Sequence, residues 1–303
     1  MKRFVNIINL LFIILILFEL DTIWKPVQNG IYAVVLFSLI EVYYLLNLFL
    51  RKDKEKVKTL GDIIAILYSL IFIWELLTAK IGILAKELFP EVGNIIKLFI
   101  SELPVLLKGF LTSIELLGVG YILALLTAVP LALIIGWRKR LYRAVNPYTK
   151  VLGPIPPTVY IPYAIALLPT FKMSSIFIIF VGAFWPIFIN TLNGVFNIDK
   201  NLIDSAKALN VGDREMLLEI ILPGTIPPIL SGATIGLTFS FILLTSAEMI
   251  GATSGMGWYV KYFSDFSDYP RVIVGILFIG IVVTGIMYIL DRAGKYLLRW
   301  KKN

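Results

Sequence analysis

Two residue types that carry much of enzyme chemistry are missing from this 303-residue chain, which contains neither cysteine nor histidine. Without cysteine there are no disulfides and no thiol nucleophiles, and without either residue the usual ligand sets of zinc sites are excluded. Histidine is also the side chain most often used for general acid–base catalysis near neutral pH. No clustered carboxylate motif replaces them, so we predict no catalytic residue, no metal and no cofactor.

Charge is also scarce, at 16% of residues against 58% hydrophobic residues. The mean hydropathy of +0.87 is far too high for a soluble domain that must cover itself with polar surface. The net charge of +8 comes from basic residues between apolar runs, which does not indicate a nucleic-acid partner. The composition therefore predicts a membrane protein.

Apolar runs long enough to cross a bilayer recur along the whole chain. A hydrocarbon core about 30 Å thick needs roughly 20 apolar residues in a helix. Runs of that order predict eight spans, at residues 4–20, 30–50, 61–79, 106–136, 150–169, 173–193, 225–250 and 271–290. We expect the first to be retained, because no small-residue cleavage pattern follows it. The predicted fold class is all-α, a polytopic transmembrane helical bundle.

The basic residues predict which side of the membrane each connection faces, since cationic loops resist translocation. Placing Lys2 and Arg3 inside puts every strongly basic connection on one side: residues 51–58, residues 138–143 and the tail from residue 292. We therefore expect a plasma or inner membrane protein with both termini in the cytoplasm. Residues 91–103 are too short and too charged to span, and are predicted to form an interfacial helix on the outer face.

The longest cytoplasmic connection, residues 194–223, carries the most specific pattern. Two short helices broken at residues 210–212 are predicted, because Asn tolerates the left-handed conformation that ends a helix. Asp213 is expected to cap the second helix and Pro223 to stop it. A short hairpin held at both ends by spans suits force transfer from a partner. A self-packed amphipathic loop would explain the same periodicity.

This stretch resembles the Glu-Ala-Ala signature of ABC importer permeases. The signature has an acidic residue and two small ones, a Gly four residues after the second small one, and then Ile-x-Leu-Pro. The corresponding positions here hold Asp204, Ser205, Ala206, Asn210, Ile220, Leu222 and Pro223. Ser for the first Ala and Asn for Gly are departures. Because Asn is the usual substitute where φ is positive, we expect the turn to survive.

The resemblance runs in order from about residue 60 to the C-terminus and points to permeases of the nitrate, sulfonate and taurine type. Its further elements are residues 102–136, the proline-rich residues 154–162, Asn190-Thr191 with Gly194, Glu248-Met249 and Gly255-Met256-Gly257-Trp258-Tyr259. This implies a type I ABC importer permease core at residues 59–303. Residues 1–58 would then be an added N-terminal transmembrane hairpin with a basic cytoplasmic linker.

The resemblance implies a transport subunit with no enzymatic activity of its own. The sequence has no Walker-type phosphate-binding run, so ATP hydrolysis is expected on a separate ATP-binding subunit. An extracytoplasmic solute-binding protein and a second permease, giving a homodimer or a pseudo-dimer, would complete the importer. Its solute would be small and polar, such as a sulfonate, nitrate, taurine or a vitamin precursor. The residues expected to couple to the ATPase are Asp204, Ser205, Ala206, Ala208, Leu209, Asn210, Gly212, Ile220, Leu222 and Pro223.

Polar side chains at membrane depth are candidates for the translocation path or its gate, because they are costly in lipid. These candidates are Glu115, Ser240, Thr245, Ser246 and Glu248. Close helix packing is an equal explanation for the hydroxyls, and pairing with another helix is the plainer one for Glu115. Glu248 fits a gate, a dimer interface or an ordinary interfacial position.

An ATP-independent secondary transporter or channel is the alternative function. It would need ion-coupling carboxylates near the midplane and often broken helices in repeated halves. The sequence has few midplane charges and no convincing internal repeat. A scaffold protein would have no reason to carry a capped hairpin that ends in Ile-x-Leu-Pro.

Overall fold

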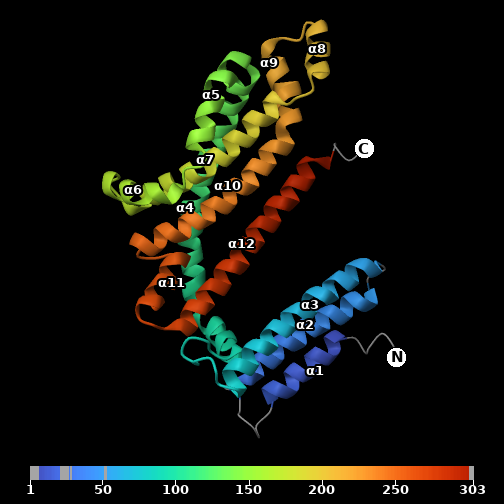
Figure 1. Ribbon diagram of the computed structural model, residues 1–303, viewed down its shortest axis with the longest axis vertical. Helices are drawn as coiled ribbons and strands as arrows, with labels where there is room; N and C mark the ends of the chain where they lie inside the picture. The colour runs from blue at the N-terminus through green and yellow to red at the C-terminus, as the bar shows by residue number, and fades with distance from the viewer. Residues whose placement is uncertain (1–6, 21–26, 28, 51–52, 300–303) are drawn as a thin grey trace. The chain divides into compact units, whose positions relative to one another are not determined.

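The computed structural model describes residues 7–20, 27, 29–50 and 53–299, and these are helical without any strand. The all-α prediction is therefore confirmed. The chain divides into two compact units, residues 1–105 with 260–277 and residues 106–259 with 278–303. Figure 1 labels the helices along the chain. Some of the cationic residues used to predict orientation lie outside the described residues, namely Lys2, Arg3, Arg51, Lys52, Lys301 and Lys302.

Three helices of the first unit pack around one apolar core. They are α1 (Ile7–Leu20), α2 (Gly30–Leu50) and α3 (Lys54–Glu75), and a π-helical turn at Leu76–Lys80 extends the third. Leu15, Phe37, Tyr44 and Tyr68 form the centre of the core. The Tyr68 hydroxyl donates to the carbonyl of Phe37 at 3.2 Å and lies 3.4 Å from Glu41 Oε2. The buried Glu41 carboxylate of α2 is thus paired with α3.

Six described helices are long and apolar enough to span a membrane, fewer than the eight predicted. They are Gly30–Leu50, Lys54–Lys80, Val92–Trp137, Phe171–Phe196, Asp213–Gly251 and Tyr269–Leu297. The described part of the run at 4–20 is the 14-residue α1. That is shorter than the roughly 20 residues a span requires.

The predicted span at residues 150–169 is wrong. The chain there forms the end of α5 (Lys139–Leu152), a 3₁₀ turn at Pro157–Tyr160 and the short α6 (Ile161–Leu167). The closely spaced prolines 154, 156 and 157 favour the break, because the residue before a proline is shifted out of the helical region, and Pro156, which precedes Pro157, has ψ 120°.

The predicted separate interfacial helix at residues 91–103 is also wrong. These residues begin α4, which runs without a break over Val92–Trp137, 46 residues in all. Pro104 removes one backbone donor without ending the helix. The apolar residues counted at 92–100 are therefore the first turns of a long helix.

A tightly packed pair, α7 (Phe171–Phe196) and α10 (Leu222–Gly251), forms the centre of the second unit. Small residues allow the close approach: a Cβ added at Gly232 would lie 2.8 Å from the Pro186 carbonyl oxygen. From α4, the Tyr121 hydroxyl donates to the Ala233 carbonyl at 2.8 Å. The remaining helices are α8 (Lys200–Ala208), α9 (Asp213–Glu215), α11 (Met256–Asp265) and α12 (Tyr269–Leu297).

Candidate functional site

A helical hairpin stands between α7 and α10 (Figure 1), and the backbone dihedral angle at its turn agrees with the prediction. Asn210 has φ 55°, which confirms the left-handed conformation expected at this position. Its N–H donates to the Lys207 carbonyl at 2.9 Å, and the N–H of Val211 donates to the Ala206 carbonyl at 3.2 Å. These two bonds form a Schellman motif, which satisfies the last carbonyls of α8.

The second arm of the hairpin differs from the prediction in two ways. Gly212, not Asp213, is the N-cap of α9, and its N–H donates to the Glu215 carboxylate at 3.3 Å. Pro223 does not stop the helix, because a π-helical turn at Met216–Ile221 leads directly into α10. Helices absorb local irregularities as single π turns, often at functional sites.

The hairpin has one packed side and one exposed side. Ala206, Met216 and Ile221 are buried in a cluster with Leu133 of α4 and Val195 of α7. The Lys207 ammonium lies 5.8 Å from the centre of the Trp137 ring at the end of α4. The remaining predicted coupling residues divide between two settings: Asp204, Ser205, Ala208, Leu209, Asn210 and Gly212 are exposed, and Ile220, Leu222 and Pro223 are half-buried.

The other end of α10 is held by a buried carboxylate. Glu248 is 1% exposed, and it accepts hydrogen bonds from Ser113 Oγ at 2.5 Å and from the Gly257 N–H at 2.7 Å. Ser113 Oγ in turn accepts from the Met256 N–H at 2.9 Å. Met256 and Gly257 are the first residues of α11, so side chains of α10 and α4 cap the N-terminus of that helix.

Gly255 makes room for this carboxylate. Its φ is 136°, a conformation that L side chains rarely adopt, and an added Cβ would lie 2.5 Å from Glu248 Cδ. A side chain at this position would therefore strain the backbone and displace the carboxylate.

The other predicted path residues are spread over different surroundings. The hydroxyls of Ser240, Thr245 and Ser246 each donate to the carbonyl four residues earlier in α10, at 2.8, 2.7 and 2.8 Å. Ser240 is fully buried, whereas the other two are partly exposed. Glu115 Oε1 lies 2.5 Å from Lys172 Nζ, and both side chains are more than half exposed. Of these candidates, only Glu248 belongs to a buried network, and the path assignments stay predictions.

A cavity of about 300 Å³ lies between the proline-rich segment, α7 and α10. Most of its lining is apolar, including Pro157, Trp185, Phe239 and Ile242. None of the five predicted path residues lines it.

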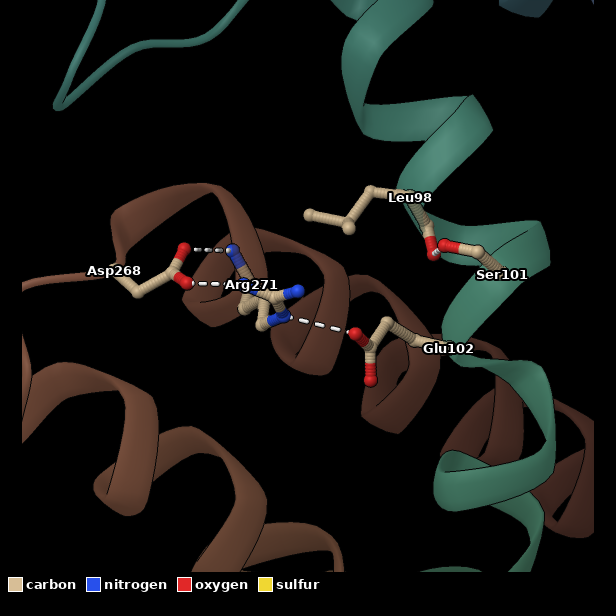
Figure 2. A network of polar contacts seen from close by, with 5 residues as sticks. All are labelled: Leu98, Ser101, Glu102, Asp268 and Arg271. Carbon is tan, nitrogen blue, oxygen red and sulfur yellow. Dashed lines mark hydrogen bonds and ion pairs between the residues drawn. The ribbon is translucent and has the colours of Figure 1, made fainter.

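A second polar network, in the first unit, joins α4 to the start of α12 (Figure 2). Arg271 Nε donates to Glu102 Oε1 at 2.8 Å, and Arg271 Nη1 donates to Asp268 Oδ2 at 2.5 Å. The guanidinium also lies over the Phe263 ring, 5.1 Å from its centre. Ser267, beside Asp268, has φ 58°. This arginine fixes the turn that leads into α12 against the first part of α4.

Sequence reasoning missed Ser113 and Arg271, the central residues of these two networks. Ser113 pairs with Glu248, 135 positions away, and Arg271 pairs with Glu102, 169 positions away, so no local spacing predicts these two contacts. Only Asp268, the second partner of Arg271, is close to it in the sequence. For the Glu248 network the sequence did offer a signal. Gly255 and Gly257 flank the start of α11, and two such glycines indicate the close approach of another element. In the described part of the chain, no group of three or more acidic side chains is arranged to hold a metal.

The sequence of this chain is similar to those of known membrane transport proteins. Residues 120–303 match the family described as binding-protein-dependent transport system inner membrane component. A putative ABC transporter permease of Methanocaldococcus jannaschii is 31% identical over 234 residues, covering 75% of this chain and 85% of that protein. The nitrate import permease NrtB of Leptolyngbya laminosa is 31% identical over 56% of this chain and 61% of its own length. A putative aliphatic sulfonates transport permease, SsuC of Bacillus subtilis, is 27% identical over 77% of this chain and 85% of its own.

Proposed function

Because the chain belongs to the family of binding-protein-dependent transport system inner membrane components, we propose that it is the permease subunit of an ATP-driven importer. In this role it forms the path for a small polar solute and couples that path to a separate ATP-binding subunit. The solute class is that of sulfonates, nitrate, taurine or vitamin precursors. The names of two relatives, which refer to nitrate and to aliphatic sulfonates, support the anionic part of this range.

The observation that carries the proposal is the hairpin of α8 and α9. Its turn is fixed by the Schellman motif at Asn210, and its inner side is anchored on the ends of α4 and α7. The opposite side presents short side chains at Ser205 and Ala208 beside the 79%-exposed Leu209. Such a surface fits into a groove of a partner, and the anchoring passes the partner's movement to the spans.

The proposed assembly contains two copies of this permease, an ATPase bound at each hairpin and a solute-binding protein on the outer face. The hairpin and both chain termini then lie in the cytoplasm. Closure of the ATPase pair would rock the helices between inward-open and outward-open arrangements, a rigid-body transition that ligands on both faces bias. Glu248, with Thr245 and Ser246, is proposed to lie at the gate, and Ser240 and Glu115 along the path.

The coupling role is tested by replacing Asp204 and Asn210 together with phenylalanine. We expect the variant to insert in the membrane normally but to lose the co-purifying ATP-binding subunit and ATP-dependent transport. Asp62→Phe, at an exposed position of α3, is the control and should retain both. Normal transport by the double variant would contradict the coupling role, and transport in vesicles without ATP would favour the secondary-transporter alternative.

The path is tested by cysteine labelling read out on this chain, which has no native cysteine of its own. Thr245→Cys and Ser246→Cys should react with a membrane-impermeant thiol reagent added to vesicles that carry the whole importer. Ser240 of α10 is fully buried, so Ser240→Cys should react only during turnover. Protection of all three positions under every condition would remove them from the path.

A further inference from the structure

The helix α5 has three distinct faces. Tyr142, Val145 and Thr149 form the packed face: the Tyr142 ring stacks on Phe196 with centroids 3.9 Å apart, Val145 packs beside the α4 and α7 core, and Thr149 is buried. This face holds α5 against the last turns of α7. The other two faces point away from the packed helices of the unit.

The second face is basic. Arg138, Lys139, Arg140, Arg143 and Lys150 lie within or next to α5, and no acidic residue occurs between positions 138 and 152. All five are exposed, and none of the ion pairs within the described residues includes any of them.

The third face is apolar and uncovered. Leu141, Ala144, Tyr148 and Val151 recur at the spacing of one helical stripe and are all exposed, with Tyr148 at 66% and Val151 at 68%. An exposed aromatic and aliphatic stripe beside a purely basic one is typical of helices that lie in a membrane interface.

The position of α5 in the unit agrees with this composition. The stacking on Phe196 places α5 beside the last turns of α7, one of the six helices long enough to span. The end of such a span is where hydrocarbon gives way to lipid headgroups. Figure 1 shows α5 at the same end of α7 as the hairpin.

We propose that α5 is a docking surface for anionic phospholipids. The basic face binds the phosphate headgroups, and the apolar stripe lies between the acyl chains just below them. The leaflet is the cytoplasmic one if the proposed function holds, but the lipid preference itself depends on neither ATP nor transport. Because Tyr142 stacks on the residue that ends α7, the bound lipid also holds the last turn before the coupling hairpin.

The test is native mass spectrometry of the purified full-length chain in a neutral detergent, with equal amounts of dioleoyl phosphatidylglycerol and dioleoyl phosphatidylcholine. We expect the wild-type chain to retain phosphatidylglycerol preferentially. R140Q/R143Q should weaken this binding roughly 30-fold, because a basic residue near an anionic membrane surface contributes about 1 kcal/mol. The charge-conserving R140K/R143K should retain it.

A matched control, K54Q/K58Q at the start of α3, removes two other exposed cations. These lie among the acidic residues Asp53, Glu55 and Asp62, and their loss should change binding less than about threefold. Y148S/V151S, which leaves the charge unchanged, should weaken phosphatidylglycerol binding about tenfold through the lost apolar contact.

Several results would overturn the proposal. One is equal lipid retention by R140Q/R143Q and the wild type. Another is a loss of lipid binding in K54Q/K58Q as large as that in R140Q/R143Q. A third is displacement of the lipid by millimolar inorganic phosphate, which would assign the site to a free anion. If R140Q/R143Q retained its lipid but lost the ATP-binding subunit, the basic face would serve that protein instead. Because lipid retention is measured on the chain alone, a failed coupling experiment leaves this result interpretable.

Discussion

The two ends of α10 differ in whether the residues there are exposed or are buried and hydrogen-bonded. At the hairpin end, Ser205, Ala208 and Leu209 are exposed although α8 is firmly anchored. At the other end, Glu248 is buried and both of its oxygens accept hydrogen bonds from neighbouring helices. A surface that is rigid but uncovered indicates a partner, whereas a fully satisfied buried network indicates a structural junction. The predictions below separate these two kinds of site.

The largest effect is expected from Glu248→Ala. This change leaves the Ser113 hydroxyl and the Gly257 N–H without their acceptor in a buried position. Each buried group left unsatisfied costs about 1 to 3 kcal/mol, so we expect a loss of about 4 kcal/mol in the free energy of unfolding. Thermal unfolding in detergent measures it. Glu248→Gln keeps one acceptor oxygen, so its stability should lie between that of the wild type and that of Glu248→Ala. Equal stability of all three proteins would contradict a structural junction.

The next effect concerns Gly255→Ala. The new methyl group meets the Glu248 carboxyl, and φ of 136° is unfavourable for alanine, so we expect a destabilisation of about 2 kcal/mol. Gly285→Ala in α12 is the matched control. No atom lies within 4 Å of its added Cβ, and alanine in a helix should gain about 0.5 to 1 kcal/mol. The two substitutions should therefore shift the midpoint of thermal unfolding in opposite directions, and a shift in the same direction would contradict the role of Gly255.

At the hairpin, Asn210→Val should affect partner binding more than stability. A β-branched residue disfavours φ of 55° by about 1 to 2 kcal/mol, which opens the Schellman turn. Asn210→Gly keeps that conformation accessible. We expect Asn210→Val to lose most of the co-purifying ATP-binding subunit and Asn210→Gly to retain it, both in stably folded protein. Equal retention would mean that the turn geometry is not part of the docking surface.

The sequence predicted the features that depend on local chemistry. Helical spans follow from runs of apolar residues, and the hairpin turn follows from an Asn in a position that requires positive φ. The errors arose where the surrounding segment determines whether a helix continues through a proline. Pro104 lies inside α4, whereas α5 ends just before the closely spaced prolines 154, 156 and 157. Proline alone does not fix the outcome, because α10 continues through Pro223, Pro227 and Pro228 although each lacks a backbone N–H.

The polar networks were less predictable than the spans. Glu248 was singled out for its position in the membrane, but its partners come from α4 and α11, and its capping role appears only in three dimensions. The basic residues of α5 were read as an orientation signal alone. Their separation from the exposed apolar stripe becomes visible only when the helix boundaries are known, because the predicted span at 150–169 had divided α5 between two elements.

The smallest effect is expected from the ion pair of Glu115 and Lys172. Both side chains are more than half exposed, so a double-mutant cycle with alanine should give a coupling energy of about 0 to 1 kcal/mol that falls further at high salt. Thermal unfolding of the chain alone and of the whole importer supplies the two values to compare. A coupling above about 2 kcal/mol that appears only in the importer would mean that assembly removes water from the pair. That result would move Glu115 from the exposed class to the buried class represented by Glu248.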